Sequence, residues 1–238
     1  MIELGLPGAR VVFTTRSGGV SEGPYSSLNL GILTDDAPDR VSRNRELLSQ
    51  ALGLDSGSVA MGWQVHGAEI KEWAGPPTAG RDGFGHPGDE LSKVDGHVTD
   101  RAGLGLLVLV ADCLPVALAS PGRVAMLHCG WRGLAAGIIE RAVGAFETPP
   151  AAAVGPGIGR CCYEVGREVL AAFSGLQGVA EDQMLDLRAV AEVTLRAAGV
   201  ERIEHVDLCT SCRADLFFSH RRDCGVTGRQ AAIVERRA

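Results

Sequence analysis

Runs of apolar residues predict four β-strands along the chain, at residues 11–15, 105–110, 123–127 and 203–208. The first run is rich in β-branched residues, which favour strands. The run 105–110 is continuously aliphatic, which is typical of a strand buried on both faces. The strand at 123–127 places His128 at its end.

Apolar residues that recur at helical spacing predict helices at 39–52, 133–146, 163–173 and 187–198. Asp39 is the expected cap of the first helix, and Gly53 and Gly199 are expected to end the first and the last. The stripe of the second helix consists of Leu134, Ile138, Ala142 and Phe146.

The remaining segments read as connections. Residues 17–27 form a Gly/Ser-rich loop, residues 76–88 a Pro/Gly-rich loop or lid, and the basic segment 217–234 is expected to pack on the protein. Strands and helices alternate irregularly, which predicts a mixed sheet and an α+β fold. No linker divides the chain, so we expect one domain over residues 1–238.

Composition and charge limit the classes of function that the chain can have. Hydrophobic residues make up 45% and charged residues 22%, as in ordinary globular proteins. The net charge of −6 argues against a broad nucleic-acid surface but leaves room for a small anion in a local pocket. The uncharged run 102–111 is too short to cross a bilayer, and the N-terminal segment does not resemble a signal peptide. We therefore expect a cytoplasmic protein with no membrane partner.

The chain has seven cysteines, an odd number that does not suit a disulfide framework. Without an export signal, reduced thiols are the expectation. Cys209 and Cys212 form a CxxC pair, but no second CxxC accompanies them. Buried or partly buried thiols are therefore favoured there over a structural zinc site.

Three residues form a candidate metal centre: His66, Cys113 and His128. Taken singly, a cysteine at the end of an apolar run is usually a small core residue, and a lone histidine is often an ordinary loop or core residue. Taken together, two imidazoles and one thiol can hold zinc and leave a fourth position open, as catalytic zinc sites do. The neighbours Pro115 and Gly130 indicate that both apolar runs stop where chemistry could begin.

Other polar residues could support this centre. Asp112 could orient a metal-bound imidazole, although a capping role at a strand end explains it equally well. Arg16, Arg132 and Arg160 stand in Gly-rich turns, where a guanidinium can bind phosphate oxygens, although most such arginines are simply surface residues. The Gly-rich segment 155–159 lacks the features of a phosphate-binding loop and reads as a structural turn.

Seven motifs in a fixed order carry a family resemblance. They are TTRSGGVS at 14–21, QVHG at 64–67, DGHVT at 95–99, ADCLP at 111–115, HCGWRG at 128–133, GPGIGRCCYEV at 155–165 and FFSHRR at 217–222. With these motifs the chain resembles the laccase-domain family over about residues 11–229. That family was once called multicopper polyphenol oxidase and is now regarded as zinc-dependent purine nucleoside phosphorylase, and some bacterial members are called peptidoglycan editing factors.

The resemblance implies a layered α/β/β/α sandwich with mixed sheets and a zinc ion on His66, Cys113 and His128. It implies phosphorolysis of adenosine, inosine, guanosine and methylthioadenosine, and deamination of adenosine at the same site. Purine nucleosides and phosphate are thus the expected partners, and we expect Arg16, Arg132, Asp112 and Cys162 to contact them. The oligomeric state stays open.

The sequence departs from the usual family pattern at Cys129, Gly157, Arg160 and His220, none of which is an expected ligand. The departures at Gly157 and Arg160 leave the details of phosphate or substrate contact open. For phosphorolysis, Arg16 or Arg132 would position phosphate, and His97 and Asp112 are the candidates to protonate the departing base.

Three other functions remain open at this stage. Cys113 could be the nucleophile of a hydrolase or amidase with His128 as its base, a reading connected with peptidoglycan precursor editing. Copper oxidation of phenols is the least favoured, because the six histidines include no His-x-His pair. A noncatalytic binding role would give no turnover with any nucleoside.

Overall fold

The structure, a computed structural model, describes residues 1–78, 80–84 and 90–237. The strands are β1 (Ile2–Leu6), β2 (Ala9–Phe13), β3 (Val59–Ala60), β4 (Ile70–Trp73), β5 (Gly96–Thr99), β6 (Gly105–Val110), β7 (Leu114–Ser120), β8 (Arg123–Cys129), β9 (Ala151–Val154), β10 (Ala180–Glu181), β11 (Met184–Leu185), β12 (Ile203–His205) and β13 (Gln230–Arg236). The helices are α1 (Pro38–Leu52), α2 (Trp131–Ala135), α3 (Ile138–Val143), α4 (Arg167–Ala172) and α5 (Leu187–Ala197), with the 3-10 turns η1 (Gly23–Tyr25) and η2 (Ser56–Ser58).

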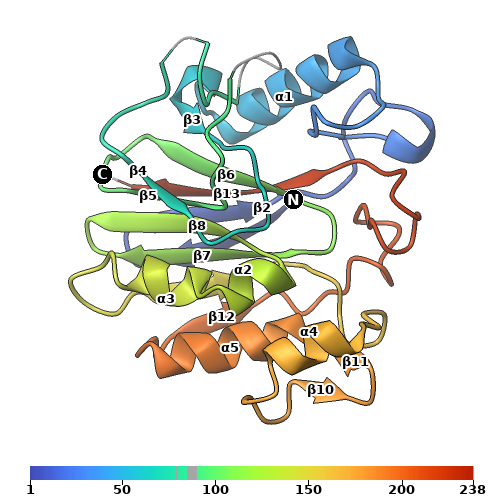
Figure 1. Ribbon diagram of the computed structural model, residues 1–238. Coiled ribbons are helices and arrows are strands. Elements are labelled where there is room, and N and C mark those ends of the chain that lie inside the picture. The colour runs from blue at the N-terminus through green and yellow to red at the C-terminus, as the bar shows by residue number, and fades with distance from the viewer. Residues whose placement is uncertain (79, 85–89, 238) are drawn as a thin grey trace.

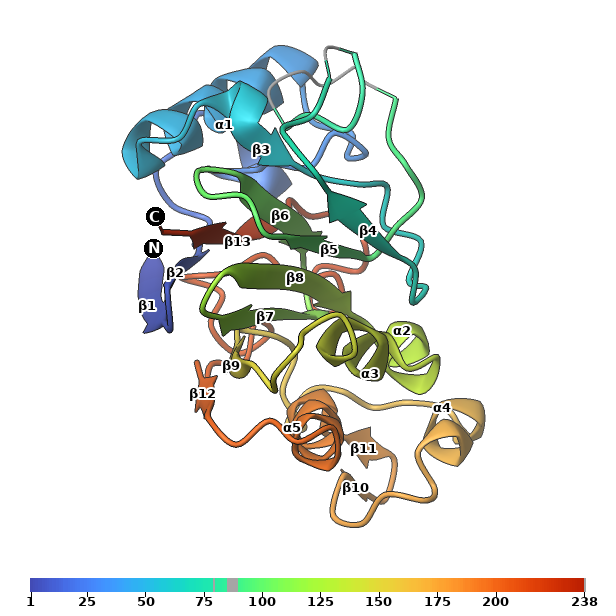
Figure 2. The ribbon, with the colours of Figure 1, turned by 90° about the vertical axis from the view of Figure 1, so that its left-hand side faces the viewer.

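Two mixed sheets are stacked face to face between helices (Figures 1 and 2). One sheet has the order β1-β2-β13-β6-β3 and the other β12-β9-β7-β8-β5-β4, with β10 and β11 forming a separate hairpin. Helix α1 covers the outer face of the first sheet, and α2 to α5 cover the outer face of the second. The expected α+β fold and its layered α/β/β/α sandwich are confirmed.

Period-two alternation within the strands builds the three apolar layers. In β6, Leu106 and Val108 face the second sheet, whereas Leu107 packs with Leu48 under α1. In β7, Ala117 and Ala119 place small side chains in the space between the sheets, since alternate side chains point to opposite faces. A strand buried on both faces therefore reads as a continuous apolar run, as expected for 105–110.

Several predicted elements are confirmed. The run 105–110 is β6, the run 123–127 lies within β8, and α1 ends at Gly53, which has φ +67°. Helix α5 matches the prediction for 187–198, and Gly199 with φ +88° follows it.

Other boundaries were wrong. Ala37, not Asp39, caps α1, and Asp39 lies in the first turn. The expected helix 133–146 is two short helices, because Gly137 adopts φ +81° between them. The helix expected at 163–173 begins only at Arg167, and the strand expected at 203–208 ends at His205. The loop 76–88 lies partly outside the described residues.

Most of the strands were not predicted, among them β7 and β13, which have long runs of paired residues. Strand β7 starts directly after Cys113, although Pro115 suggested a stop, and Pro115 pairs with His128 in the antiparallel register. Strand β13 lies inside the basic segment 217–234, yet it is the central strand of its sheet, between β2 and β6. Within the described part of the chain, no helix is long and apolar enough to span a lipid bilayer.

A buried amide fixes the loop that carries the TTRSGGVS motif. Asn44 of α1 is fully buried and accepts a hydrogen bond from the Val20 amide at 2.8 Å. Its Nδ2 donates to Ser21 Oγ and to the Asn29 carbonyl, both at 2.8 Å, and to the Ser27 carbonyl at 3.2 Å. One side chain thus satisfies four loop groups that have no strand partner.

We predict that Asn44→Ala lowers the free energy of unfolding by about 2–4 kcal/mol, because several buried polar groups lose their partner. Urea unfolding monitored by circular dichroism measures the change. The control is Arg43→Ala on the same helix, whose side chain is half exposed and forms only an ion pair with Glu46. Its effect should stay within about 0.5 kcal/mol. Equal effects of the two substitutions would contradict the role of Asn44.

Candidate metal centre and its cavity

Three chain segments bring His66, Cys113 and His128 together. His66 lies in the loop between β3 and β4, Cys113 ends the short link from β6 to β7, and His128 lies near the end of β8. Their ligand atoms are all within 4.8 Å of one another. The two imidazole rings are edge to face, with centroids 4.8 Å apart. The trio predicted from sequence therefore converges in space.

Asp95, directly before β5, holds two of these ligands in place. One oxygen is 2.8 Å from His128 Nδ1, and the carboxylate also accepts amide hydrogens from Val65, His66 and Gly67 at 2.8–3.1 Å. These bonds stabilise His66 at φ +61°, a backbone conformation that residues other than glycine seldom adopt. With Nδ1 bonded to a carboxylate, Nε2 of His128 is left for the centre.

Close approach of the backbone explains two glycines of the HCGWRG motif. A Cβ at Gly130 would lie 3.0 Å from Cys113 Sγ and 3.1 Å from His66 Cδ2. A Cβ at Gly133 would lie 2.7 Å from the Gly67 carbonyl oxygen. The helix that follows β8 can pack against the ligand loop only without these side chains.

The electrostatics of the metal-free centre favour a thiolate. Burial raises the pKa of the Cys113 thiol, but the neighbouring His128 and His66 outweigh it and lower this pKa to about 6. Burial lowers the pKa of His128, but Cys113 and Asp95 outweigh it and raise that pKa to about 9. Cys113 and His128 therefore behave as an ion pair near neutral pH, and thiolate is the form of cysteine that binds metals.

The centre forms part of the wall of a cavity of about 460 Å³, a size typical of small-molecule sites. The cavity contains both cationic and apolar surface. Its guanidinium groups come from Arg132, Arg221 and Arg229, and Tyr163 and His220 add further polar groups. The larger apolar lining residues include Leu33, Met61, Trp63, Leu91, Leu109 and Ile158.

Two of the other predicted contact residues line this cavity, namely Arg132 and Asp112. The guanidinium carbon of Arg132 lies 4.5 Å from the ring centroid of Trp131. The Asp112 carboxylate does not touch an imidazole ligand; it accepts hydrogen bonds from Thr210 Oγ1 at 2.6 Å and from the Arg221 amide at 2.7 Å. Asp95, rather than Asp112, is thus the carboxylate that orients His128.

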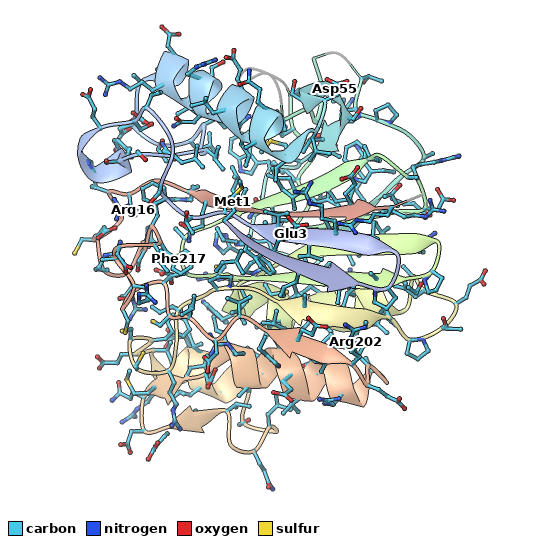
Figure 3. The ribbon with its side chains drawn as sticks, turned by 180° about the vertical axis from the view of Figure 1, so that it is seen from behind. Met1, Glu3, Arg16, Asp55, Arg202 and Phe217 are labelled. Carbon is cyan, nitrogen blue, oxygen red and sulfur yellow. The ribbon has the colours of Figure 1, made fainter. Side chains whose placement is uncertain are left out.

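Arg16 and Cys162 lie elsewhere. Arg16 donates to the Ser26 and Ala214 carbonyls and stacks 4.6 Å from the Phe218 ring centroid. Figure 3 labels it beside the chain segment that holds Phe217. Arg16 is not among the described residues that line the cavity, and neither is Cys162. The sulfur of Cys162 lies 3.4 Å from the sulfur of Cys212.

His97, a candidate proton donor, is fully buried behind the site and accepts a hydrogen bond from Trp73 Nε1 at 3.2 Å. Burial lowers its pKa to about 4. Its environment is that of a neutral core histidine.

Sequence reasoning missed Asp95, Tyr163, Arg221 and Arg229 as parts of the site. The first three lie in motifs that were recognised, but no periodicity or spacing brings them to the centre. Arg229 precedes the unpredicted strand β13. A signal existed for Asp95, because it directly precedes β5, and β5 pairs with the strand that carries His128.

The fold and the site define a class: a two-sheet α+β protein with a three-ligand, metal-capable centre at the wall of a small-molecule cavity. The sequence model of the family described as multi-copper polyphenol oxidoreductase laccase matches residues 10–237. The chain belongs to this family.

Relatives are similar over nearly their whole length. The chain is 37% identical to purine nucleoside phosphorylase YlmD of Geobacillus stearothermophilus, covering 97% of this chain and 91% of the relative. It is 37% identical to purine nucleoside phosphorylase YfiH of Escherichia coli, covering 95% and 93%. The crystal structure of the G. stearothermophilus YlmD superposes with a TM-score of 0.88 at 35% identity, covering 97% of this chain and 93% of the other.

We predict that Gly130→Ala weakens zinc binding about 10–100-fold, the range typical for changes just outside the ligands of a metal. The added methyl group would push on two ligand side chains, whereas φ −79° at this position suits alanine. Competition with a chelating dye measures the dissociation constant. Gly5→Ala is the control, since nothing lies within 4 Å of its Cβ. Unchanged affinity in Gly130→Ala would refute the steric argument.

The reactivity of the Cys113 thiol is expected to depend on pH. In metal-free protein, alkylation of Cys113 should rise with pH through a midpoint near 6, since the thiolate reacts and the pKa is lowered to about 6. The reaction should fade below that pH, whereas in urea-unfolded protein the midpoint should be near 8.5. Peptide mapping after iodoacetamide treatment at each pH measures it, and bound zinc should protect the thiol. Identical midpoints in folded and unfolded protein would contradict the ion pair.

Proposed function

We propose that the protein is a zinc-dependent purine nucleoside phosphorylase acting on adenosine, inosine, guanosine and methylthioadenosine, with adenosine deaminase activity at the same site. One observation carries the proposal: His66, Cys113 and His128 converge at the wall of a cavity that also holds three guanidinium groups and an apolar surface. Relatives that share most of this chain are named purine nucleoside phosphorylases, which supports the same reading.

The donor set fits zinc. Two imidazoles and one thiolate are borderline-soft ligands, and three protein ligands leave a position for a reactant. Cys113 is held ready as a thiolate, and Asp95 fixes the ring of His128. When bound, the ion supplies Lewis acidity, which polarises an oxygen and activates water near neutral pH.

Different residues of the cavity would bind the phosphate and the purine during phosphorolysis. Arg132 and Arg221 can bind phosphate oxygens in a bidentate manner, and Arg229 adds a third positive charge to the cavity lining. The apolar wall that contains Leu109 and Ile158 suits the flat face of a purine. A phosphate oxygen attacks C1′ of the ribose, the bond from C1′ to the base breaks, and the base leaves with an added proton. The enzyme's main contribution is position and charge.

His220 is a better candidate for the proton donor than the two residues named from sequence. It lines the cavity, whereas His97 is fully buried away from it. Both carboxylate oxygens of Asp112 already accept hydrogen bonds. Tyr163 also lines the cavity, but burial raises its pKa to about 12, which makes its phenol a weaker acid.

A second candidate function uses the same side chains without a metal. The Cys113 thiolate beside a protonated His128 is the arrangement of a cysteine-nucleophile hydrolase or amidase, such as one acting on peptidoglycan precursors. A thiol hydrolase keeps its activity in a chelator, whereas the zinc enzyme loses it.

The test is incubation of purified protein with adenosine and phosphate, with chelator and after zinc is restored. We expect adenine and ribose-1-phosphate, with inosine as the deamination product, and loss of all three in chelator. Cys113→Ala should lower the rate about 10³-fold or more, in line with the several kcal/mol that a catalytic metal supplies. The control Cys224→Ser, at an exposed cysteine outside the cavity lining, should keep full activity.

The two activities can fail separately. Adenine without inosine would remove only the deaminase activity, and no product with zinc restored would remove the proposal. Copper instead of zinc in active protein would overturn the choice of metal.

A further inference from the structure

A second cluster of metal-ligating side chains lies outside the centre described above. Cys161, Cys162, Cys209 and Cys212 come from two segments of the chain, and their four sulfur atoms all lie within 4.8 Å of one another. The sulfur of Cys212 is 3.5 Å from that of Cys161 and 3.4 Å from that of Cys162. Cys162, expected at the substrate, and the CxxC pair, expected to be buried or partly buried thiols, thus meet in one place, where Cys161 and Cys212 are exposed.

We infer that these four cysteines form a closed tetrathiolate zinc site, distinct from the His/Cys/His centre. Zinc bound to four sulfurs at about 2.3 Å in a tetrahedron separates them by about 3.8 Å, which is close to the distances found here. Disulfide bonds would need only pairs of cysteines in contact, whereas here all four sulfurs lie within 4.8 Å of one another. Four protein ligands are the mark of a structural zinc site.

The backbone around Cys209 is arranged for a thiolate. The Gly159 amide donates to Cys209 Sγ at 3.2 Å, and a Cβ at Gly159 would lie 3.3 Å from Cys161 Sγ. Arg222 donates to the carbonyl of Ser211 at 3.3 Å, and its charge is paired with Asp223.

The position of the cluster indicates what the ion would do. It would join the segment 157–163 to the segment 209–213, which are otherwise held by single contacts such as the Thr210 amide to the Gly157 carbonyl at 3.0 Å. Tyr163, next to Cys162, lines the cavity, and Thr210, next to Cys209, hydrogen-bonds to Asp112. The site therefore braces one wall of the cavity without contributing a group to it.

The test counts metal ions. Protein produced with zinc and purified under reducing, anaerobic conditions should hold two zinc ions per chain by elemental mass spectrometry, one for each ligand group. The double variant Cys161→Ser/Cys212→Ser, at two exposed positions, should hold one, as should Cys113→Ala. Cys224→Ser is the matched control at another exposed cysteine and should keep both. The double variant should also unfold at a lower Tm than the control.

If the double variant does not fold, a second measurement tests whether four sulfurs bind one metal ion. Cys113→Ala loaded with cobalt should show the strong thiolate-to-metal absorption of four sulfur ligands in a tetrahedral field. Three results would overturn the inference: one zinc ion in the wild type that disappears in Cys113→Ala, iron at the four cysteines, or an intact mass that reveals disulfides among them. None of these results removes the proposed phosphorylase, which depends on a metal at the His/Cys/His centre.

Discussion

One buried carboxylate is the interaction on which the site depends. Asp95 accepts hydrogen bonds from three successive amides of the His66 loop and from the ring of His128. Burial raises its pKa, but His128 and the amides, led by that of Gly67, outweigh it and lower this pKa, so the charge is retained. The same group thus sets an unusual backbone conformation in one ligand and the ring orientation of another. A loop and a strand become one rigid support, which is what a three-ligand centre requires.

The third ligand owes its position to the stacking of the sheets. Cys113 ends a three-residue link, Ala111–Cys113, through which the chain passes from β6 in one sheet to β7 in the other. Both strands are almost wholly buried, so the link has little freedom to move. Asp112 in its middle has φ +99°, and its side-chain hydrogen bonds stabilise that conformation. Cys113 is therefore placed where two packed layers meet, whereas His66 comes from an exposed loop.

The local pattern of apolar residues was enough to predict those helices and strands whose burial follows that pattern alone. Strand β6 was found because its apolar run is continuous, and helices α1 and α5 were found because their apolar residues recur at helical spacing. It failed where tertiary context overrides it. Proline does not end β7, the positive φ of Gly137 divides a helix that the stripe joined, and β13 was hidden in a basic segment. The ligand trio was predictable from residue type, whereas Asp95 needed knowledge of which strands pair.

The two cysteine-containing clusters differ in the one respect that separates reactive from structural metal sites. The His/Cys/His group has three donors and lines the cavity, whereas the four-cysteine group offers four donors and is not among the described residues that line it. A chain of contacts connects them: Cys209 precedes Thr210, Thr210 bonds to Asp112, and Asp112 precedes Cys113. Because Asp112 holds a conformation that few side chains adopt, loss of the outer ion would act on the inner centre through geometry alone. All three inner donors would still be present, so the effect would be a weaker hold on the inner metal rather than its exclusion.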